Sequence, residues 1–502
     1  MMNQLPKAWQ RDTFHWLAFG ALVLATAILF GYNYLYGERI QFNGGLGWDG
    51  AAYADWARRS PANLLGKREL SEYYIGRILP PILVHYFAKF FGLNLTSDLG
   101  VIRAFYIYNC LCIAVGAIAL LDVGRVRQWS RLNAITVVSL VFINYAVMKN
   151  MSYNPTLTDM TALAAACLLA DALARNSVTG LMVVGFASCF IWPSFLFVVI
   201  PLIAFQGARG HEGQTAKWLP PVCSAVIASA LVGGTVYAYW QGFRPRTDVN
   251  QLNSHLLWLS APIAIAFLFT VLKRFADPYY FLSSIRTISV VNVVYALGLY
   301  LAVKGTTLLF SNGDPGPLTP GNYLPLIILG GMVNPGLNLV AHLTHFGPII
   351  SIALILWSDI ERRVRQSGPG LVMLFGTFGF LAIGTESRQF IPFIPFIGVL
   401  IGDTLSDERR ESWTGYWYFT VIAFALSRFW LTINVAPWTG NYLEFPDQML
   451  YMYTGPWMSN TMYSVFLWIC IIVAVASFSI WQAFYRCSIV DHNKKEKALG
   501  QP

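Results

Sequence analysis

The sequence contains few charged residues. Asp, Glu, Lys and Arg make up only 12% of its 502 residues, whereas a soluble domain carries about 25%. Hydrophobic residues make up 56% and recur in helix-length runs without the alternation of barrel strands. A bilayer core about 30 Å thick needs ~20 apolar residues in helix, and only helices or closed barrels satisfy the backbone in lipid. We therefore predict an all-α polytopic membrane protein, a single integral-membrane domain over 1–502.

Sequence signatures of soluble catalytic domains and of metal sites are also missing. There is no GxxxxGK[ST] loop and no GxGxxG after a strand, so nothing in the sequence is typical of nucleotide binding. The seven cysteines fall inside apolar runs or near the C-terminal end, and no Cys/His spacing resembles a metal site. No internal repeat is evident, which counts mildly against many secondary transporters.

The net charge of +9 is spread over short segments between apolar runs. This is the positive-inside pattern, which fixes membrane orientation, and it argues against a nucleic-acid partner. The clusters are Lys7 and Arg11; Arg125, Arg127 and Arg131; Arg175; Arg209 and Lys217; Lys273 and Arg274; Arg362, Arg363 and Arg365; Arg409 and Arg410; and Arg486, Lys494, Lys495 and Lys497.

Placing every cluster inside predicts about fourteen spans with both termini cytoplasmic. We expect 78–91 to be a helix on the outer surface, because counting it as a span would put Arg125 outside. Composition and short loops favour a bacterial inner (cell) membrane. The expected spans are 14–36, 101–121, 132–148, 158–174, 178–191, 193–206, 218–240, 255–272, 288–310, 345–358, 369–384, 390–403, 416–433 and 460–482. The expected extracytoplasmic segments are 37–100, 149–157, 241–254, 311–344 and 434–459.

The first of these outer segments carries the most polar residues. Asp49 and Tyr53 are four positions apart and share one face of a helix, together with Trp56, whereas Asp55 points away. A carboxylate beside aromatic rings suits a sugar site, where the rings stack on the sugar and the carboxylate accepts a hydroxyl proton. The alternative is an Asp49 that only caps a helix, with interfacial aromatic residues around it.

Several motifs of this region resemble a known superfamily. The stretch Asp49-Gly50-Ala51-Ala52-Tyr53 and its continuation to Arg58 resemble the D-E-x-x-Y-A-x-x-A-R first-loop motif of aminoarabinose and protein mannosyl transferases, which belong to the GT-C glycosyltransferases. The resemblance covers motifs over 45–175 and only topology elsewhere. Further similar motifs are Leu79-Pro80-Pro81-Ile82, Phe91-Gly92, Arg103 and Asn154-Pro155-Thr156-Leu157-Thr158-Asp159.

The resemblance implies a GT-C-like fold with juxtamembrane helices in the first loop. Asp49 would be the general base of an inverting transfer from a polyprenyl-phosphate sugar to a glycan, glycolipid or protein. The second acid of the motif is Gly50 in this chain, so its role passes to Asp55 or Asp159, or is absent. That role is acceptor binding or metal contact. We predict no metal ligands and name no cofactor. A divalent metal is the alternative that we do not favour.

Five further ionisable residues are candidates for substrate binding, since ionisable residues at membrane depth are costly. Arg388 would bind the donor phosphate, with Glu386 beside it, as in the E-x-R of some bacterial members; the alternative is a structural Glu386–Arg388 pair. Arg77 and Lys304 are also phosphate candidates, and Arg77 could instead reach headgroups. His85, on the surface helix, could bind headgroups or the donor phosphate.

We therefore predict an extracytoplasmic, lipid-dependent glycosyltransferase. The alternative is a transporter or flippase of lipid-linked sugars or other amphiphiles. Flippases usually carry charges near the bilayer midplane and paired broken helices, whereas this chain concentrates its polar residues in outer loops.

Overall fold

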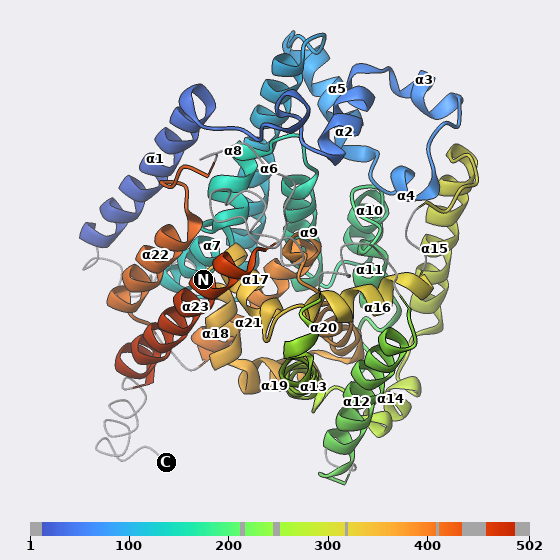
Figure 1. Cartoon of the computed structure of the whole chain (residues 1–502), viewed down its shortest axis with the longest axis vertical. Coiled ribbons are helices and arrows are strands. Elements are labelled where there is room, and N and C mark those ends of the chain that lie inside the picture. Colours follow the sequence, from blue (N-terminus) through green and yellow to red (C-terminus); the bar gives the residue numbers. More distant parts are fainter. Residues whose placement is uncertain are drawn as a thin grey trace, which may run out of the picture.

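A computed structural model describes residues 13–210, 216–243, 252–316, 320–407, 411–433 and 458–486. Every regular element in these ranges is a helix, as the sequence predicts, and the helices form one bundle (Figure 1). Both chain ends, Arg409 and Arg410, and nearly all of the expected outer segment 434–459 lie outside the described residues.

Seven of the described helical segments are long and apolar enough to cross a membrane. Two bent pairs of helices raise the number to as many as nine. The class of polytopic helical membrane protein is therefore confirmed, while the count of fourteen spans stays a prediction. The seven lie in α1 (Thr13–Tyr36), α6 (Asp98–Val126), α12 (Leu219–Trp240), α13 (Leu257–Leu272) with the turn before it, α15 (Val290–Phe310), α21 (Ile394–Asp407) with η6 (Ser387–Phe393), and α23 (Asn460–Ile480) with residues to Phe484.

Several expected spans form shorter helices. Where 178–191 and 193–206 were expected, α10 (Val178–Ser188) and α11 (Phe195–Ala204) flank a turn that contains Pro193. Proline lacks the amide hydrogen that a continuing helix needs. The other shorter helices at expected spans are α9 (Asp159–Ala174), α20 (Pro369–Leu381) and α22 (Trp413–Ser427).

The expected span 345–358 is wrong as a single helix. The chain breaks at Gly347, between α17 (Leu337–Phe346) and α18 (Pro348–Ile355), and the two helices meet at 120°. Gly347 has a φ of 70° and a ψ of −150°, a conformation open mainly to glycine, and Pro348 then begins a new helix. α17 and α16 (Pro320–Gly331) occupy part of the expected outer segment 311–344, and nine of the ten residues of α17 are buried.

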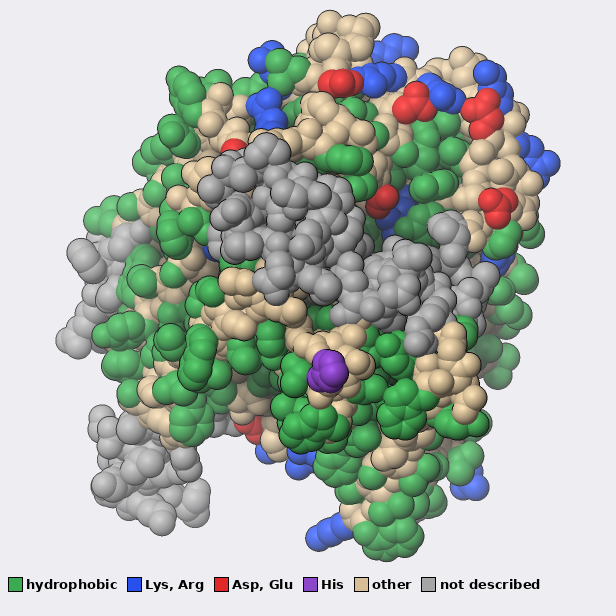
Figure 2. Space-filling model, viewed as in Figure 1, with side chains coloured by type: hydrophobic (Ala, Val, Ile, Leu, Met, Phe, Trp, Pro, Cys, Tyr) green, Lys and Arg blue, Asp and Glu red, His purple; other side chains and the backbone are tan. Residues whose placement is uncertain are grey.

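The first expected outer segment, 37–100, which we call the first loop, forms the short 3₁₀ helix η2 (Phe42–Gly45) and four short α-helices at one end of the bundle (Figure 1). The four α-helices are α2 (Asp49–Arg58), α3 (Pro61–Gly66), α4 (Glu72–Ile75) and α5 (Leu79–Phe91). α5 matches the expected surface helix 78–91 and ends at Gly92, whose φ is 66°. Acidic and basic side chains gather at this end of the molecule, and hydrophobic ones cover much of its flanks (Figure 2).

Hydrogen bonds fasten this loop to distant parts of the chain. The Arg58 Nε donates to the Leu95 carbonyl at 3.0 Å, and the Arg68 Nε donates to the Ser311 carbonyl at 3.0 Å. The Asn312 amide donates to the Leu70 carbonyl at 2.8 Å. The loop is therefore held between the start of α6 and the end of α15, which fixes the position of α2.

Candidate active site

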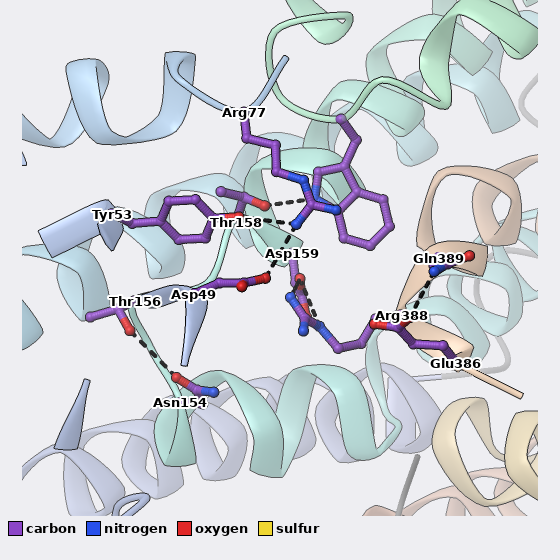
Figure 3. A network of polar contacts seen from close by, with 11 residues as sticks. Asp49, Tyr53, Arg77, Asn154, Thr156, Thr158, Asp159, Glu386, Arg388 and Gln389 are labelled. Carbon is purple, nitrogen blue, oxygen red and sulfur yellow. Dashed lines mark hydrogen bonds and ion pairs between the residues drawn. The ribbon is translucent and has the colours of Figure 1, made fainter. Parts of the chain in front are cut away.

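Asp49 and Tyr53 both contact Arg77 (Figure 3). The Arg77 Nη1 donates to Asp49 Oδ2 at 3.3 Å and to the Tyr53 hydroxyl oxygen at 3.1 Å. Asp49 is the first residue of α2 and Tyr53 lies one turn later on the same face, as predicted from their spacing. Asp49 is 39% exposed and Arg77 only 14%. A mostly buried cation thus orients a carboxylate that solvent can still reach.

Two aromatic rings enclose the guanidinium of Arg77. Its carbon lies 4.4 Å from the centre of the Tyr73 ring and 5.6 Å from that of Trp192, distances suited to cation–π attraction. Burial disfavours the charge, but the nearby Tyr53, Tyr73 and Asp49 outweigh it and raise the pKa of Arg77. Burial also raises the pKa of Tyr53 and of Tyr73. Arg77 therefore stays charged and both phenols stay protonated over the physiological range.

The turn before α2 packs against residues 154–158, the loop singled out by its sequence motif. The Thr156 hydroxyl donates to the Leu46 carbonyl at 2.8 Å. A Cβ at Gly50 would overlap Thr156 Oγ1, and one at Gly47 would meet the Asn154 side chain at 3.0 Å. Thr156 thus occupies the space that a side chain at position 50 would need. This packing explains why position 50, where the similar transferase motif has its second acid, is a glycine in this chain.

A second ion pair lies beside the first one (Figure 3). The Arg388 Nε and Nη2 donate to both oxygens of Asp159, the shortest contact being 2.9 Å. The side chain of Asp159 is only 4% exposed and that of Arg388 13%. Because Asp159 begins α9 and Arg388 lies in η6, this pair joins the first half of the chain to the second. A bidentate, charge-assisted contact of this kind is among the stronger polar interactions in proteins.

Arg388 therefore does not form the Glu386–Arg388 pair that we weighed from the sequence. Glu386 instead accepts a hydrogen bond from the Gln389 Nε2 at 2.7 Å, and Gln389 in turn accepts one from the Tyr323 hydroxyl. Glu386 helps to raise the pKa of both Tyr73 and Tyr323, for which burial is the largest cause. Glu386 is therefore close to Tyr73, one of the two aromatic residues beside Arg77.

The other three candidates have partners of their own. Asp55 pairs with Arg59 at 2.8 Å and is 46% exposed, facing away from Asp49 as expected. The His85 Nδ1 lies 2.8 Å from the Ala57 carbonyl and ties α5 to α2. The Lys304 Nζ donates to Glu72 Oε2 at 2.9 Å. Asp49, Tyr53, Arg77, Asp159, Glu386 and Arg388 thus come together, while Asp55, His85 and Lys304 lie around them in other contacts.

Several contacting residues were not predicted from the sequence. Tyr73 and Trp192 flank Arg77, and the Trp192 Nε1 donates to the Thr158 hydroxyl at 2.6 Å. Trp192 lies in the turn before Pro193, between two predicted spans, and aromatic residues are common there as membrane anchors. Its sequence environment therefore gave no sign that it reaches a polar site.

No metal centre is evident among the described residues, in which no three His, Cys, Asp or Glu side chains come close enough to hold an ion. His342, one of two histidines three positions apart, is instead hydrogen-bonded to Ser387 and to the Ala382 carbonyl. Comparison of the chain with protein-family models, curated proteins and solved structures found no match. The arrangement itself offers a partly exposed carboxylate, two guanidinium groups and aromatic surface, a set suited to deprotonating a hydroxyl beside an anionic group.

Proposed function

We propose that the protein is a membrane glycosyltransferase that moves a sugar from a polyprenyl-phosphate donor to an extracytoplasmic acceptor. The observation that carries this proposal is the pairing of Asp49 with Arg77. Asp49 is 39% exposed, yet Arg77, which also donates to the Tyr53 hydroxyl, holds it at one end of the bundle. A base must be both reachable and oriented, and a carboxylate that only capped a helix would need neither the buried guanidinium nor its aromatic enclosure.

In the proposed reaction, Asp49 accepts the proton of an acceptor hydroxyl. The freed oxygen attacks the anomeric carbon of the sugar and forms the new glycosidic bond with inversion. The bond from that carbon to the phosphate oxygen breaks, and its electron pair leaves with the polyprenyl phosphate. The aromatic rings near Arg77 would line the sugar, while Arg77 and Arg388 would offset the negative charge that develops on the phosphate.

We propose in addition a GT-C-like organisation with about fourteen spans and the site on the extracytoplasmic face. Support comes from the first-loop motif, from α5 as a surface helix, and from the 154–159 loop packed under α2. Acceptors of this class would be an envelope glycan, a glycolipid or a protein. Lys304 and His85 remain proposed contacts for the donor phosphate.

The test uses the purified protein, a labelled polyprenyl-phosphate sugar and Asp49→Asn. We expect this variant to fold and to release polyprenyl phosphate about 10²–10⁴-fold more slowly, the usual contribution of a general base. The matched control is Asp55→Asn, which removes an exposed carboxylate on the other face of α2 and should stay active. Wild-type turnover by Asp49→Asn would overturn the assignment.

Transport of lipid-linked sugars is a second candidate, supported by the 120° break between α17 and α18. Broken helices are typical of substrate sites in secondary transporters, and His342 and His345 lie buried beside this break. The same labelled donor separates the two functions. A transferase cleaves the donor and releases polyprenyl phosphate, whereas a flippase moves it intact to the other leaflet.

A further inference from the structure

A groove of about 330 Å³ lies between α17, α22 and α23, apart from the ion pairs of the candidate active site. Its floor includes the buried Arg428 and Phe466, and its rim includes Trp430 and Val465, which are 63% and 44% exposed. The lining is otherwise almost wholly aliphatic. The volume is at the lower end of the ~300–1,000 Å³ typical of ligand pockets.

Among the residues that the structure describes, Arg428 is the one charged residue that lines this groove. Its guanidinium lies over the ring of Tyr145 at 3.9 Å, and its Nη2 donates to the Thr344 carbonyl at 3.0 Å. The ring of Phe466 is 5.1 Å away. These contacts fix a cation at the groove wall, where burial makes electrostatic attraction stronger than in water.

Arginine is also an unusual residue for the backbone conformation at position 428. Arg428 follows the last residue of α22 with a φ of 52°, in the left-handed region where helices usually end on glycine or asparagine. A long side chain there costs backbone energy that glycine would avoid. The end of the helix does not require an arginine here, so we attribute the residue to the contacts that its guanidinium makes.

The charged end of the groove lies on the same side of the bundle as the first loop. The Lys149 Nζ donates both to Glu38, which follows α1, and to the carbonyl of the groove residue Leu431 at 2.7 Å. From Val465 the groove follows α23 to Val473, roughly 12 Å at the rise of a helix. α23 is one of the seven membrane-crossing candidates, so the apolar part extends into the bilayer from a charged end.

We propose that this groove binds one anionic membrane lipid. Its phosphate would meet Arg428, whose planar guanidinium suits phosphate oxygens, and one hydrocarbon chain would lie along α22 and α23. Neighbouring side chains on α23 such as Trp468 and Ile472, which are 66% and 65% exposed, present the apolar surface that lipid covers. The proposal rests on the membrane class of the protein and is independent of glycosyl transfer.

The test is native mass spectrometry of the purified full chain, titrated with phosphatidylglycerol or with zwitterionic phosphatidylcholine. We expect one tightly held phosphatidylglycerol on the wild type and weaker binding of phosphatidylcholine. Arg428→Gln should weaken the phosphatidylglycerol adduct about tenfold or more, because a charge-assisted contact is lost, and Arg428→Lys, which keeps the charge without the planar guanidinium, should bind more tightly than Arg428→Gln. The control Arg286→Gln removes an exposed arginine at the end of α14 (Pro278–Ile285) and should have no effect.

A second pair of variants guards against misfolding of the arginine variants. Ala425→Phe fills the groove and should abolish the adduct, while Val475→Phe, at a 62% exposed position of α23 that does not line the groove, should leave it intact. Wild-type binding by both Ala425→Phe and Arg428→Gln would overturn the proposal. Equal binding of phosphatidylcholine would overturn it as well. Displacement of the lipid by millimolar inorganic phosphate would also overturn it, since the hydrocarbon chain of the lipid would then contribute nothing to binding.

Discussion

Gly50 lies directly against Thr156, so that any side chain at position 50 would overlap the threonine hydroxyl. This contact joins the start of α2 to the loop before α9, and it brings together two motifs that are more than 100 positions apart in the sequence. It also accounts for the departure of this chain from the D-E motif of the transferases that it resembles.

The first prediction concerns this packing. Gly50→Glu, which restores the acidic pair, should destabilise the protein, because the added Cβ has no room. Combining it with Thr156→Gly should recover much of the loss, measured as thermal stability of the detergent-solubilised protein. Gly66→Glu is the control, since nothing lies within 4 Å of a Cβ at Gly66. Equal stability of Gly50→Glu and the wild type would contradict the contact.

A second prediction concerns the buried pair of Asp159 and Arg388. Asp159→Asn leaves a guanidinium buried without its counter-charge, which typically costs about 3–5 kcal/mol. We expect a clear fall in the midpoint of thermal unfolding. Glu69→Gln breaks the exposed contact with Arg59 and should cost no more than about 1 kcal/mol. If both variants unfold at the same temperature, the bidentate pair is not holding the two halves together.

The third prediction separates two roles of Lys304. If its ammonium contacts the donor phosphate, Lys304→Met should raise the donor KM several-fold with little change in kcat. Glu72→Gln breaks the same ion pair but frees the ammonium, so the donor KM should stay the same or fall. Matching increases in KM for both variants would show instead that the pair only fastens α4 to α15.

A fourth prediction concerns Glu361, in α19 (Trp357–Ser367) at the opposite end of the bundle from the first loop (Figure 1). Its side chain is fully buried and lies 3.5 Å from Arg274. Burial raises the pKa of Glu361 from its ordinary value of 4.5 to about 7, even though Lys273 and Arg274 act in the opposite direction. The folded protein therefore binds this proton more tightly than the unfolded chain does.

Stability should accordingly fall between pH 4.5 and pH 7, where the unfolded chain loses the proton and the fold retains it. Glu361→Gln removes the effect, so the variant should be more stable than the wild type above pH 7, by about 3 kcal/mol at most. The difference should vanish below pH 4.5. Thermal unfolding of both proteins across this range checks the sign, and a wild type that gains stability relative to the variant on going from pH 5 to pH 8 would refute it.

Much of the fold was predictable because a chain in lipid must satisfy its own backbone hydrogen bonds, which restricts its spans to helices or closed barrels. The long apolar runs of α6, α12, α15 and α23 were placed within a few residues. The break at Gly347 was missed because the run around it is apolar on both sides, and hydropathy cannot distinguish a straight span from a bent one. Only the left-handed conformation of the glycine and the proline after it mark the bend.

For the candidate site, the sequence alone determined that Asp49 and Tyr53 share a helix face and that this face belongs to a polar loop of a membrane protein. Those features depend on helical spacing and composition, which are local. The tertiary structure decided that Arg77 joins them, that Arg388 pairs with Asp159, and that Thr156 excludes a side chain at Gly50. These contacts join residues tens to hundreds of positions apart, and only the packing of the helices brings such residues within hydrogen-bonding distance.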